Sequence, residues 1–305
     1  MENGSDLHVE DDEFRAEHNV SAPTTHGCLS IVATPIGNLS DISPRARETL
    51  RGAQLIACED TRRTGLLLHA LGFKVALVSL HAHNESARVP ELLTRLIAGA
   101  RIALVSDAGM PGVSDPGGHL VSAAHAEGIR VEVIPGPSAV TAAIAAAGAP
   151  ADRFIFAGFL PRKSGERTAL FDRLDSVGWP VVAFESPHRL PGLLAELAAR
   201  DPERRIAICR EISKLYEQTQ VGSVADLVAE TTETPIRGEI TLVLWPCAGQ
   251  QDADAAEKRL EETIAALLNA GLSPGKAADL AAQIGAGARN AAYRTALAAA
   301  KRRAT

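Results

Sequence analysis

Aromatic residues are scarce in this sequence: they make up 4% of its 305 residues, whereas hydrophobic residues of all kinds make up 46%. The core must therefore be built mainly from Ala, Val, Leu and Ile, and the length suffices for two packed domains. No apolar run reaches the ~18 residues that span a membrane, and the acidic N-terminus lacks the apolar core of a signal peptide. We expect a cytoplasmic protein with no membrane partner.

Cysteine is also rare, and its spacing excludes a zinc ribbon or finger. The four cysteines are far apart, and none belongs to a CxxC pair; they are Cys28, Cys58, Cys209 and Cys247. Structural zinc sites need clustered ligands. We expect reduced thiols, mostly within apolar segments, and no bound metal.

The net charge of −6 comes from the N-terminal end of the chain. Residues 1–27 hold seven acidic residues and one basic residue, and the remainder holds 30 of each sign. This segment is polar and lacks periodicity, so we predict a disordered acidic tail over residues 1–27. The body is neutral, and the acidic total does not exclude an acidic partner such as RNA.

Short apolar segments alternate with helical patterns from Cys28 onward. Strands are predicted at 29–33, 54–58, 75–80, 102–106 and 131–134, and helices at 43–52, 64–71, 88–98, 119–127 and 138–147. This alternation predicts a parallel sheet covered on both faces, so the fold class is α/β. Gly148 and Pro150 mark the expected boundary, which gives an N-terminal α/β domain over residues 28–149.

A second α/β series follows over residues 150–248. Strands are predicted at 154–157, 181–184, 205–209, 218–221 and 239–244, with a short helix between the last two, which favours a mixed sheet. Residues 249–305 contain only helical patterns, near 255–270, 274–284 and 288–300. From Ser273 on this module holds six basic residues and one acidic residue, which suits either nucleic-acid docking or a solvated face of a packing appendage.

Four loops rich in Gly and Pro fall at predicted strand ends, namely 34–38, 107–112, 135–138 and 158–161. In open parallel sheets ligands bind beyond the carboxyl ends of the strands, so these loops are expected to line one cleft between the domains. The phosphate-binding patterns GxxxxGK[ST] and GxGxxG are absent at the expected places. Lysine-free loops fit S-adenosylmethionine, which carries no phosphate, better than ATP or NAD. Glu59 and Asp60, at the end of the second strand, suit either a ribose hydroxyl or helix capping.

Seven motifs in fixed order carry a resemblance to a known family. They are IVATPIGN (31–38), ACEDTR (57–62), HAHNE (81–85), LVSDAGMP (104–111), SDPG (114–117), VIPGPS (133–138) and AGFLPRK (157–163). From Cys28 to Pro246 the chain resembles the tetrapyrrole-methylase-fold enzymes, and specifically the branch of small-subunit ribosomal RNA 2′-O-ribose methyltransferases I. The resemblance implies a homodimer, S-adenosylmethionine as donor, and a cytidine ribose in the decoding region of 16S rRNA in the 30S subunit as acceptor, with no role for DNA.

The resemblance also implies the donor-binding residues of this chain. They are Pro35, Gly37, Asp107, Ala108, Gly109, Met110, Pro111, Ser114, Asp115, Pro137, Ser138, Phe159, Leu160 and Gly238. Two residues depart from the family pattern: Met110 stands where threonine is usual, and Gly112 where a larger apolar residue is usual. Asp107 and Ser138 also suit loop fixing or helix capping.

A ribose hydroxyl becomes a good nucleophile when a base removes its proton. The candidates for that base are Glu59, His81, Asp115 and Glu239, by their positions in loops. Each also has a structural interpretation, such as an ion pair of Glu59 with Arg62, helix capping by Asp115, or a loop histidine with its hydrogen bonds satisfied.

Basic residues in or beside the predicted cleft and in the helical module are candidates for RNA phosphate contacts: Arg62, Arg63, Arg162, Lys163, Arg289, Lys301 and Arg302. Arg167 and Arg189 are expected to belong to a solubilising surface instead. Two other functions fit the same sequence, a corrin or porphyrin C-methyltransferase and a non-catalytic ribosome-binding module. The basic helical module argues against the first, whereas Met110 is the residue that favours the second.

Overall fold

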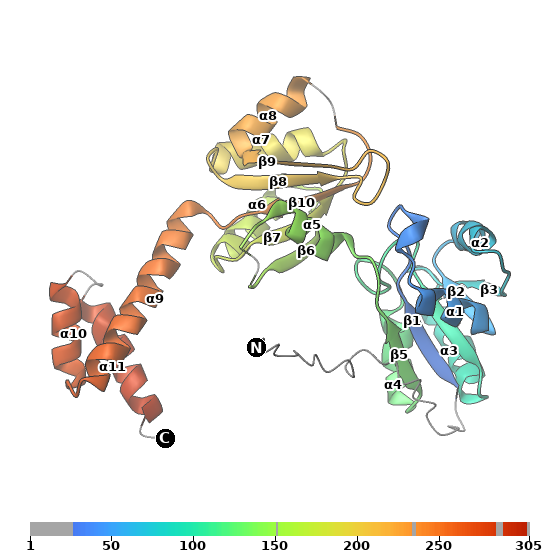
Figure 1. The fold of residues 1–305 in the computed structure, drawn as a ribbon, viewed down its shortest axis with the longest axis horizontal. Coiled ribbons are helices and arrows are strands. Elements are labelled where there is room, and N and C mark those ends of the chain that lie inside the picture. Colours follow the sequence, from blue (N-terminus) through green and yellow to red (C-terminus); the bar gives the residue numbers. More distant parts are fainter. Residues whose placement is uncertain (1–26, 151, 234–235, 285–288, 304–305) are drawn as a thin grey trace, which may run out of the picture.

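The computed structural model describes residues 27–150, 152–233, 236–284 and 289–303. The predicted acidic tail lies outside these residues, except for Gly27. Two α/β domains are followed by three helices (Figure 1). Of the helices within the described ranges, none is both long and apolar enough to cross a membrane.

The first sheet contains five parallel strands in the order β3-β2-β4-β1-β5. Their bounds are β1 Cys28–Val32, β2 Leu55–Cys58, β3 Leu77–Ser79, β4 Arg101–Val105 and β5 Arg130–Ile134. The parallel sheet predicted from the alternating pattern is therefore confirmed. Because all five strands run the same way, their carboxyl ends meet at one edge.

Helices cover both faces of this sheet. Helices α1 (Pro44–Gly52) and α2 (Thr61–Ala70) pack on one face, around Leu50, Ile56 and Leu68. Helices α3 (Glu85–Ile97) and α4 (Gly118–Ala126) pack on the other, around Leu96 and Leu104. Successive side chains of a strand point to opposite faces, so nearly every strand residue is apolar.

Capping side chains determine where α1 and α2 begin, and only the start of α1 agrees with the prediction. Helix α1 begins as predicted, because Ser43 Oγ accepts a hydrogen bond from Ala46 N at 3.1 Å and Pro44 fills the first position. Helix α2 begins at Thr61 rather than at residue 64, because Asp60 Oδ1 accepts from Arg62 N at 2.8 Å.

Helix α5 (Ala139–Ala147) follows the first sheet in the chain but packs on the second. Its Val140, Ala143 and Ile144 share one hydrophobic cluster with Val182 and Val243 of the second sheet. By its packing α5 thus belongs to the second sheet, although the boundary predicted at residues 149 and 150 would leave it with the first. The loop at residues 135–138 is what crosses between the two sheets.

The second sheet is mixed, as predicted, with strand order β6-β7-β10-β8-β9. Its strands are β6 Ile155–Phe159, β7 Val181–Glu185, β8 Arg205–Arg210, β9 Gln218–Ser223 and β10 Ile240–Leu244. Only β6 and β7 pair in parallel, whereas β10 runs antiparallel to both of its neighbours. Three helices pack against the sheet opposite α5: α6 (Ser164–Asp175), α7 (Leu190–Arg200) and α8 (Val224–Glu233).

The chain ends in three helices that pack on one another: α9 (Ala248–Asn269), α10 (Pro274–Gln283) and α11 (Arg289–Arg303). Their shared core consists mainly of alanine, with Leu260, Ile264 and Leu268 from α9. Small side chains let the three helices approach closely. Figure 1 shows this module at the opposite side of the second domain from the first domain.

A buried carboxylate fixes the start of α4. Glu85, the first residue of α3, accepts hydrogen bonds through Oε1 from the backbone N of Gly117 and of His119, each at 3.0 Å. Its side chain thereby satisfies two amides at a helix N-terminus, where the helix dipole also favours a negative charge.

Replacing Glu85 with Ala should therefore cost about 1–3 kcal/mol of unfolding free energy, because the buried amide of Gly117 and the part-buried amide of His119 lose their acceptor. Urea unfolding of the purified protein measures this change. Glu91→Ala is the matched control: it removes an exposed acid of the same helix whose pairs with Arg88 and Arg95 are worth little. An unchanged midpoint for Glu85→Ala would contradict the capping role.

Candidate active site between the two domains

A cavity of about 440 Å³ opens where the carboxyl edge of the first sheet faces the second domain. This volume suits a ligand of nucleoside size. Residues of both domains line it: Ile36, Glu59, Arg63, Asp107, Ala108, Gly109, Met110, Val113, Ser114, Asp115, Ser138, Ala139, Val140, Phe159, Phe184, Glu185, Ser186, Pro187, Gly238, Glu239, Ile240 and Thr241. The cleft predicted between the domains is therefore present.

The first domain forms one wall of the cavity, called here the first wall. This wall is held in place by the buried Thr34, which follows β1. Its backbone N donates to Gly109 O at 2.9 Å, and its carbonyl accepts from Gly109 N at 3.1 Å. Its hydroxyl donates to Ser106 O at 3.1 Å. Gly109 has φ +85°, a conformation that favours glycine, and an added Cβ would lie 3.4 Å from Ile36. The loops after β1 and β4 thus form one rigid unit.

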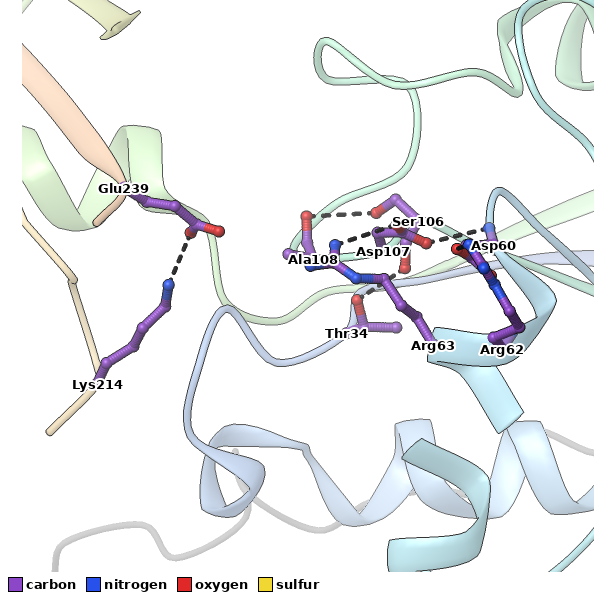
Figure 2. Close-up of polar contacts among 9 residues, drawn as sticks. All are labelled: Thr34, Asp60, Arg62, Arg63, Ser106, Asp107, Ala108, Lys214 and Glu239. Atoms are coloured by element: carbon purple, nitrogen blue, oxygen red, sulfur yellow. Dashed lines mark hydrogen bonds and ion pairs between the residues drawn. The ribbon is translucent and has the colours of Figure 1, made fainter. Parts of the chain in front are cut away.

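Asp107 joins this unit to helix α2 (Figure 2). Its carboxylate accepts from Asp60 N at 3.1 Å and from Arg63 Nη1 at 3.1 Å. This is the loop-fixing role that the sequence left open for Asp107, although the residue also lines the cavity. The ion pair of Glu59 with Arg62, the structural alternative for Glu59, is not the pair that forms: Arg62 Nη2 contacts Asp60 at 2.6 Å and holds the pKa of Asp60 well below its usual range.

Two carboxylates meet in the cavity, and their environment disfavours charge on both. The pKa of Asp115 is raised to about 6, mainly by burial and next by the negative charge of Glu59. Burial, followed by the charge of Asp107, raises the pKa of Glu59 as well. Asp115 does not cap α4, as one interpretation held, because Gly117 is the N-cap residue and Glu85 accepts from the first amides. A carboxylate with a pKa near neutrality is suited to proton transfer.

His81, another candidate base, is not among the described residues that line the cavity. It is half-buried, its ring packs edge-on against His83, and its charge acts on Glu59. Its Nδ1 is buried without a hydrogen-bond partner among the described residues. The position of His81 therefore suits an influence on Glu59, not contact with a ligand in the cavity.

The N-terminus of α5 points its first residues at the cavity, where Ser138, Ala139 and Val140 are part of the lining. Ser138 is the N-cap residue, but within the described chain its side chain accepts no capping hydrogen bond. Ser138 thus occupies the predicted cap position, but among the described residues its hydroxyl does not act as the capping acceptor. Its hydroxyl, together with the positive end of the helix dipole, can meet a negatively charged group.

The wall of the second domain includes residues that the sequence did not indicate. Phe184 and Glu185 end β7, and Ile240 and Thr241 begin β10, which pairs antiparallel with β7 and sets Ile240 opposite Glu185. Ligands of parallel sheets bind at the carboxyl ends of the strands, so the sequence indicated only those ends. Because β10 is antiparallel to β7, it is the amino end of β10 that lies beside the cavity. A sequence signal was present in the string FESPHR (184–189), which begins with the last two residues of β7, because polar residues there end an apolar strand.

A lysine spans the rim on the side of the second domain (Figure 2). Lys214, in the loop between β8 and β9, contacts Glu211 at 2.9 Å and Glu239 at 3.0 Å through Nζ. Its stem lies so close to Gly37 that an added Cβ there would approach Lys214 Cγ to 2.2 Å. Ser213 of the same loop donates to Asp41 of the first domain. The rim thus joins the two domains, and Glu239 is engaged in an ion pair.

Five of the residues predicted to bind the donor lie outside the cavity lining. Pro35 and Pro137 are half-buried in neighbouring loops, Pro111 is buried, Gly37 contacts Lys214, and Leu160 belongs to the core of the second domain. The other nine line the cavity: Asp107, Ala108, Gly109, Met110, Ser114, Asp115, Ser138, Phe159 and Gly238.

The predicted RNA-binding residues fall into three groups. Arg63 lines the cavity and Arg62 precedes it in α2; they are paired with Asp107 and Asp60, respectively, and are largely exposed. Arg162 and Lys163 are exposed after β6, where Lys163 contacts Glu166. In the helical module Arg289 pairs with Asp279 at 2.6 Å, whereas the side chains of Lys301 and Arg302 lie outside the described part of the structure.

The solubilising surface role expected for Arg167 and Arg189 is wrong, because both side chains are largely buried and each pairs with an acid. Arg167 pairs with Glu196, and Arg189 Nη2 contacts Glu185 Oε1 at 2.5 Å. The four cysteines are free, and Cys58 and Cys209 are buried. Within the described ranges no group of His, Cys, Asp and Glu side chains has the arrangement of a metal site.

Comparison with known proteins places this architecture in a family. The model of the Tetrapyrrole (Corrin/Porphyrin) Methylases matches residues 29–228. The chain belongs to this family of methyltransferases. Ribosomal RNA small subunit methyltransferase I of Xylella fastidiosa (strain Temecula1 / ATCC 700964) is 44% identical over 273 residues, which are 88% of this chain and 99% of that protein. The enzyme of the same name from Escherichia coli O157:H7 is 43% identical over 283 residues, 91% of this chain and 97% of that protein.

The fold is also that of a solved family member. The uroporphyrin-III C-methyl transferase from Thermus thermophilus, complexed with S-adenosylhomocysteine, has a TM-score of 0.52 at 21% identity. The match covers 72% of this chain and 97% of that one. At this identity the likeness concerns the fold of the tetrapyrrole methylases alone.

The raised pKa of Asp115 predicts how stability depends on pH. Its pKa is higher in the folded than in the unfolded chain, so the charged form is disfavoured by folding, and stability falls as pH rises from about 4 through about 6. Asp115→Asn removes this loss. We expect the variant to gain melting temperature over the wild type at pH 8 and to gain less at pH 4, as measured by calorimetry. An equal difference at both pH values would contradict it.

Proposed function

We propose that this methyltransferase transfers a methyl group from S-adenosylmethionine to the 2′-hydroxyl of a cytidine ribose in the decoding region of 16S rRNA. The observation that carries the proposal is the near full-length similarity to relatives named ribosomal RNA small subunit methyltransferase I. The proposed acceptor is the 30S subunit in the cytoplasm, and the proposed active form is a homodimer.

The charges of the cavity fit this donor. The lining carries the acids Glu59, Asp107, Asp115, Glu185 and Glu239, and Arg63 is its one cation within the described chain. An acidic cavity suits the sulfonium and ammonium groups of S-adenosylmethionine, and it repels the phosphates of ATP or NAD. The helix N-terminus at Ser138 would meet the carboxylate of the donor, and Val140, Phe184 and Ile240 offer an apolar surface for the adenosine.

Asp115 is the base that the geometry favours among the four candidates. It lines the cavity with a pKa of about 6, whereas Glu239 is held by Lys214 and His81 lies outside the lining. Bound S-adenosylmethionine supplies a methyl group that its sulfonium already makes electrophilic. Asp115 accepts the proton of the attacking ribose hydroxyl and later releases it to water, while Glu59 keeps the pKa of Asp115 raised.

Met110 lines the cavity where the family pattern has threonine. The turn it belongs to is set by backbone contacts of Gly109, which a side-chain change at residue 110 leaves in place. We therefore propose that Met110 alters donor affinity and does not abolish activity.

Methyl transfer from tritiated donor to purified 30S subunits tests the function. We expect label in the ribose of a 16S cytidine, with less in free rRNA and none in a corrin precursor. Asp115→Asn should lower the rate about 10²–10⁴-fold by removing the base, and the wild-type rate should fall as pH drops below about 6. A full-rate Asp115→Asn enzyme would exclude Asp115, and label in the corrin precursor alone would exclude the function.

RNA affinity should depend on salt, because phosphate contacts release counterions. Arg62→Ala and Arg162→Ala, which remove exposed cations near the cavity, should each weaken 30S binding and lessen the salt slope by about one. Arg95→Ala is the control: it removes an exposed arginine near the C-terminal end of α3, away from the carboxyl edge of the sheet. Filter binding across salt concentrations measures both quantities, and a flat dependence would argue against phosphate contacts.

A further inference from the structure

Phe159 combines two properties that seldom occur together in a phenylalanine. It lines the cavity, and it is nevertheless 64% exposed. Exposing a ring of this size forfeits the stabilisation that its burial would contribute. The ring also stands at the carboxyl end of β6, beside the catalytic edge of the fold.

A bulge in β6 directs the ring toward the cavity. Residues three apart in a regular strand point to opposite faces, but Phe156 and Phe159 both contact Phe184, with ring centroids 5.1 and 5.3 Å away. The pairing of β6 with β7 shifts register between these two residues, and Gly158 has φ +65°. Such a bulge re-aims the side chain that follows it. Phe184 then supports Phe159 from behind.

The loop that follows Phe159 is rigid because two arginines bind its carbonyl groups. Arg189 Nη1 donates to Leu160 O at 3.1 Å, and Arg167 Nη1 donates to the carbonyls of Pro161 and Arg162, each at 2.8 Å. Both arginines are themselves fixed by acids, Arg189 by the buried Glu185 and Arg167 by Glu196. The exposed ring therefore sits on a preorganised support, which lowers the entropy cost of binding.

Two cations follow the ring within four residues. Arg162 and Lys163 are exposed, and Lys163 makes only a surface pair with Glu166 among the described residues. An aromatic face next to cations is the arrangement that proteins use for single-stranded RNA, where bases stack on rings and phosphates meet basic side chains. The donor carries no phosphate for these cations, so the arrangement points to the acceptor.

We propose that Phe159 is the platform on which an unstacked nucleobase of the RNA acceptor strand stacks, with Arg162 contacting the adjoining phosphate. The inference rests on the proposed function and adds to it the means by which one nucleotide is held with its ribose at the cavity. It assigns the Phe159 ring to the acceptor, although the family resemblance implies a donor contact for this residue.

Phe159→Leu tests the assignment because it keeps apolar bulk and removes the aromatic face. We expect it to weaken binding of 30S subunits roughly ten- to hundred-fold, the usual effect of one stacked base. Phe159→Tyr keeps the aromatic face, so its affinity for 30S subunits should stay near the wild-type value. Affinity for S-adenosylhomocysteine, measured by calorimetry on the same preparations, should stay unchanged in both variants.

Trp179→Leu is the matched control, and thermal melts check that each variant folds. Trp179 is a partly exposed aromatic of the same domain, it packs on Arg153, and it precedes β7, at the sheet edge opposite Phe159. We expect its 30S affinity to equal that of the wild type.

Unchanged 30S affinity in Phe159→Leu would overturn the proposal. So would an equal loss of S-adenosylhomocysteine affinity, which would assign the ring to the donor and leave the proposed function intact. Failure of the proposed function gives a different result: wild-type enzyme would bind S-adenosylhomocysteine yet transfer no methyl group to 30S subunits. The binding measurements with Phe159→Leu need no methyl transfer, so they decide the role of the ring whenever the wild-type enzyme binds 30S subunits.

Discussion

The reciprocal backbone hydrogen bonds between Thr34 and Gly109 connect the loops after β1 and β4, the two central neighbours of the first sheet. A loop rich in glycine would otherwise sample many conformations, and ordering it would cost conformational entropy on ligand binding. The hydrogen bonds of Thr34 and Gly109 order this loop when the chain folds, so ligand binding does not have to order it. Asp107 extends the same unit to α2 through Asp60 N and Arg63. The position of every group on this wall, including Asp115, depends on that fixed backbone.

The second wall depends on the crossing of α5. Because α5 packs on the second sheet while its N-terminus follows β5, the chain carries the start of this helix to the carboxyl edge of the first sheet. The two domains therefore meet at a helix N-terminus, where Val113 of the first domain also packs against the cluster of α5 and the second sheet. Lys214, which packs against Gly37 and pairs with Glu239, joins them a second time. A cavity between domains with two such connections retains its shape and still opens to solvent.

The sequence predicted the parallel sheet, the mixed sheet and most of the first wall, because local periodicity and the glycine loops encode them. It could not predict what depends on tertiary packing. The pKa of Asp115 follows from burial and from Glu59, which lies 56 positions earlier in the chain. Glu185 and Thr241 enter the lining because β10 runs antiparallel to β7, an orientation that no short pattern encodes. Leu160 was predicted to bind the donor but packs in the core of the second domain, because a motif does not indicate which of its side chains point into the core.

Charge is distributed in two layers around the site. Acids dominate the interior, where burial and neighbouring acids raise the pKa of Glu59 and Asp115. Arg62 of α2 and the loop residues Arg162 and Lys163 lie exposed outside the cavity. A polyanion such as RNA is attracted to the outer layer, but an acidic interior repels its phosphates. A part of the strand that carries no charge can therefore enter more readily than its phosphates. The same acids favour the cationic donor, so one distribution of charge can select both substrates and keep the RNA backbone outside the cavity.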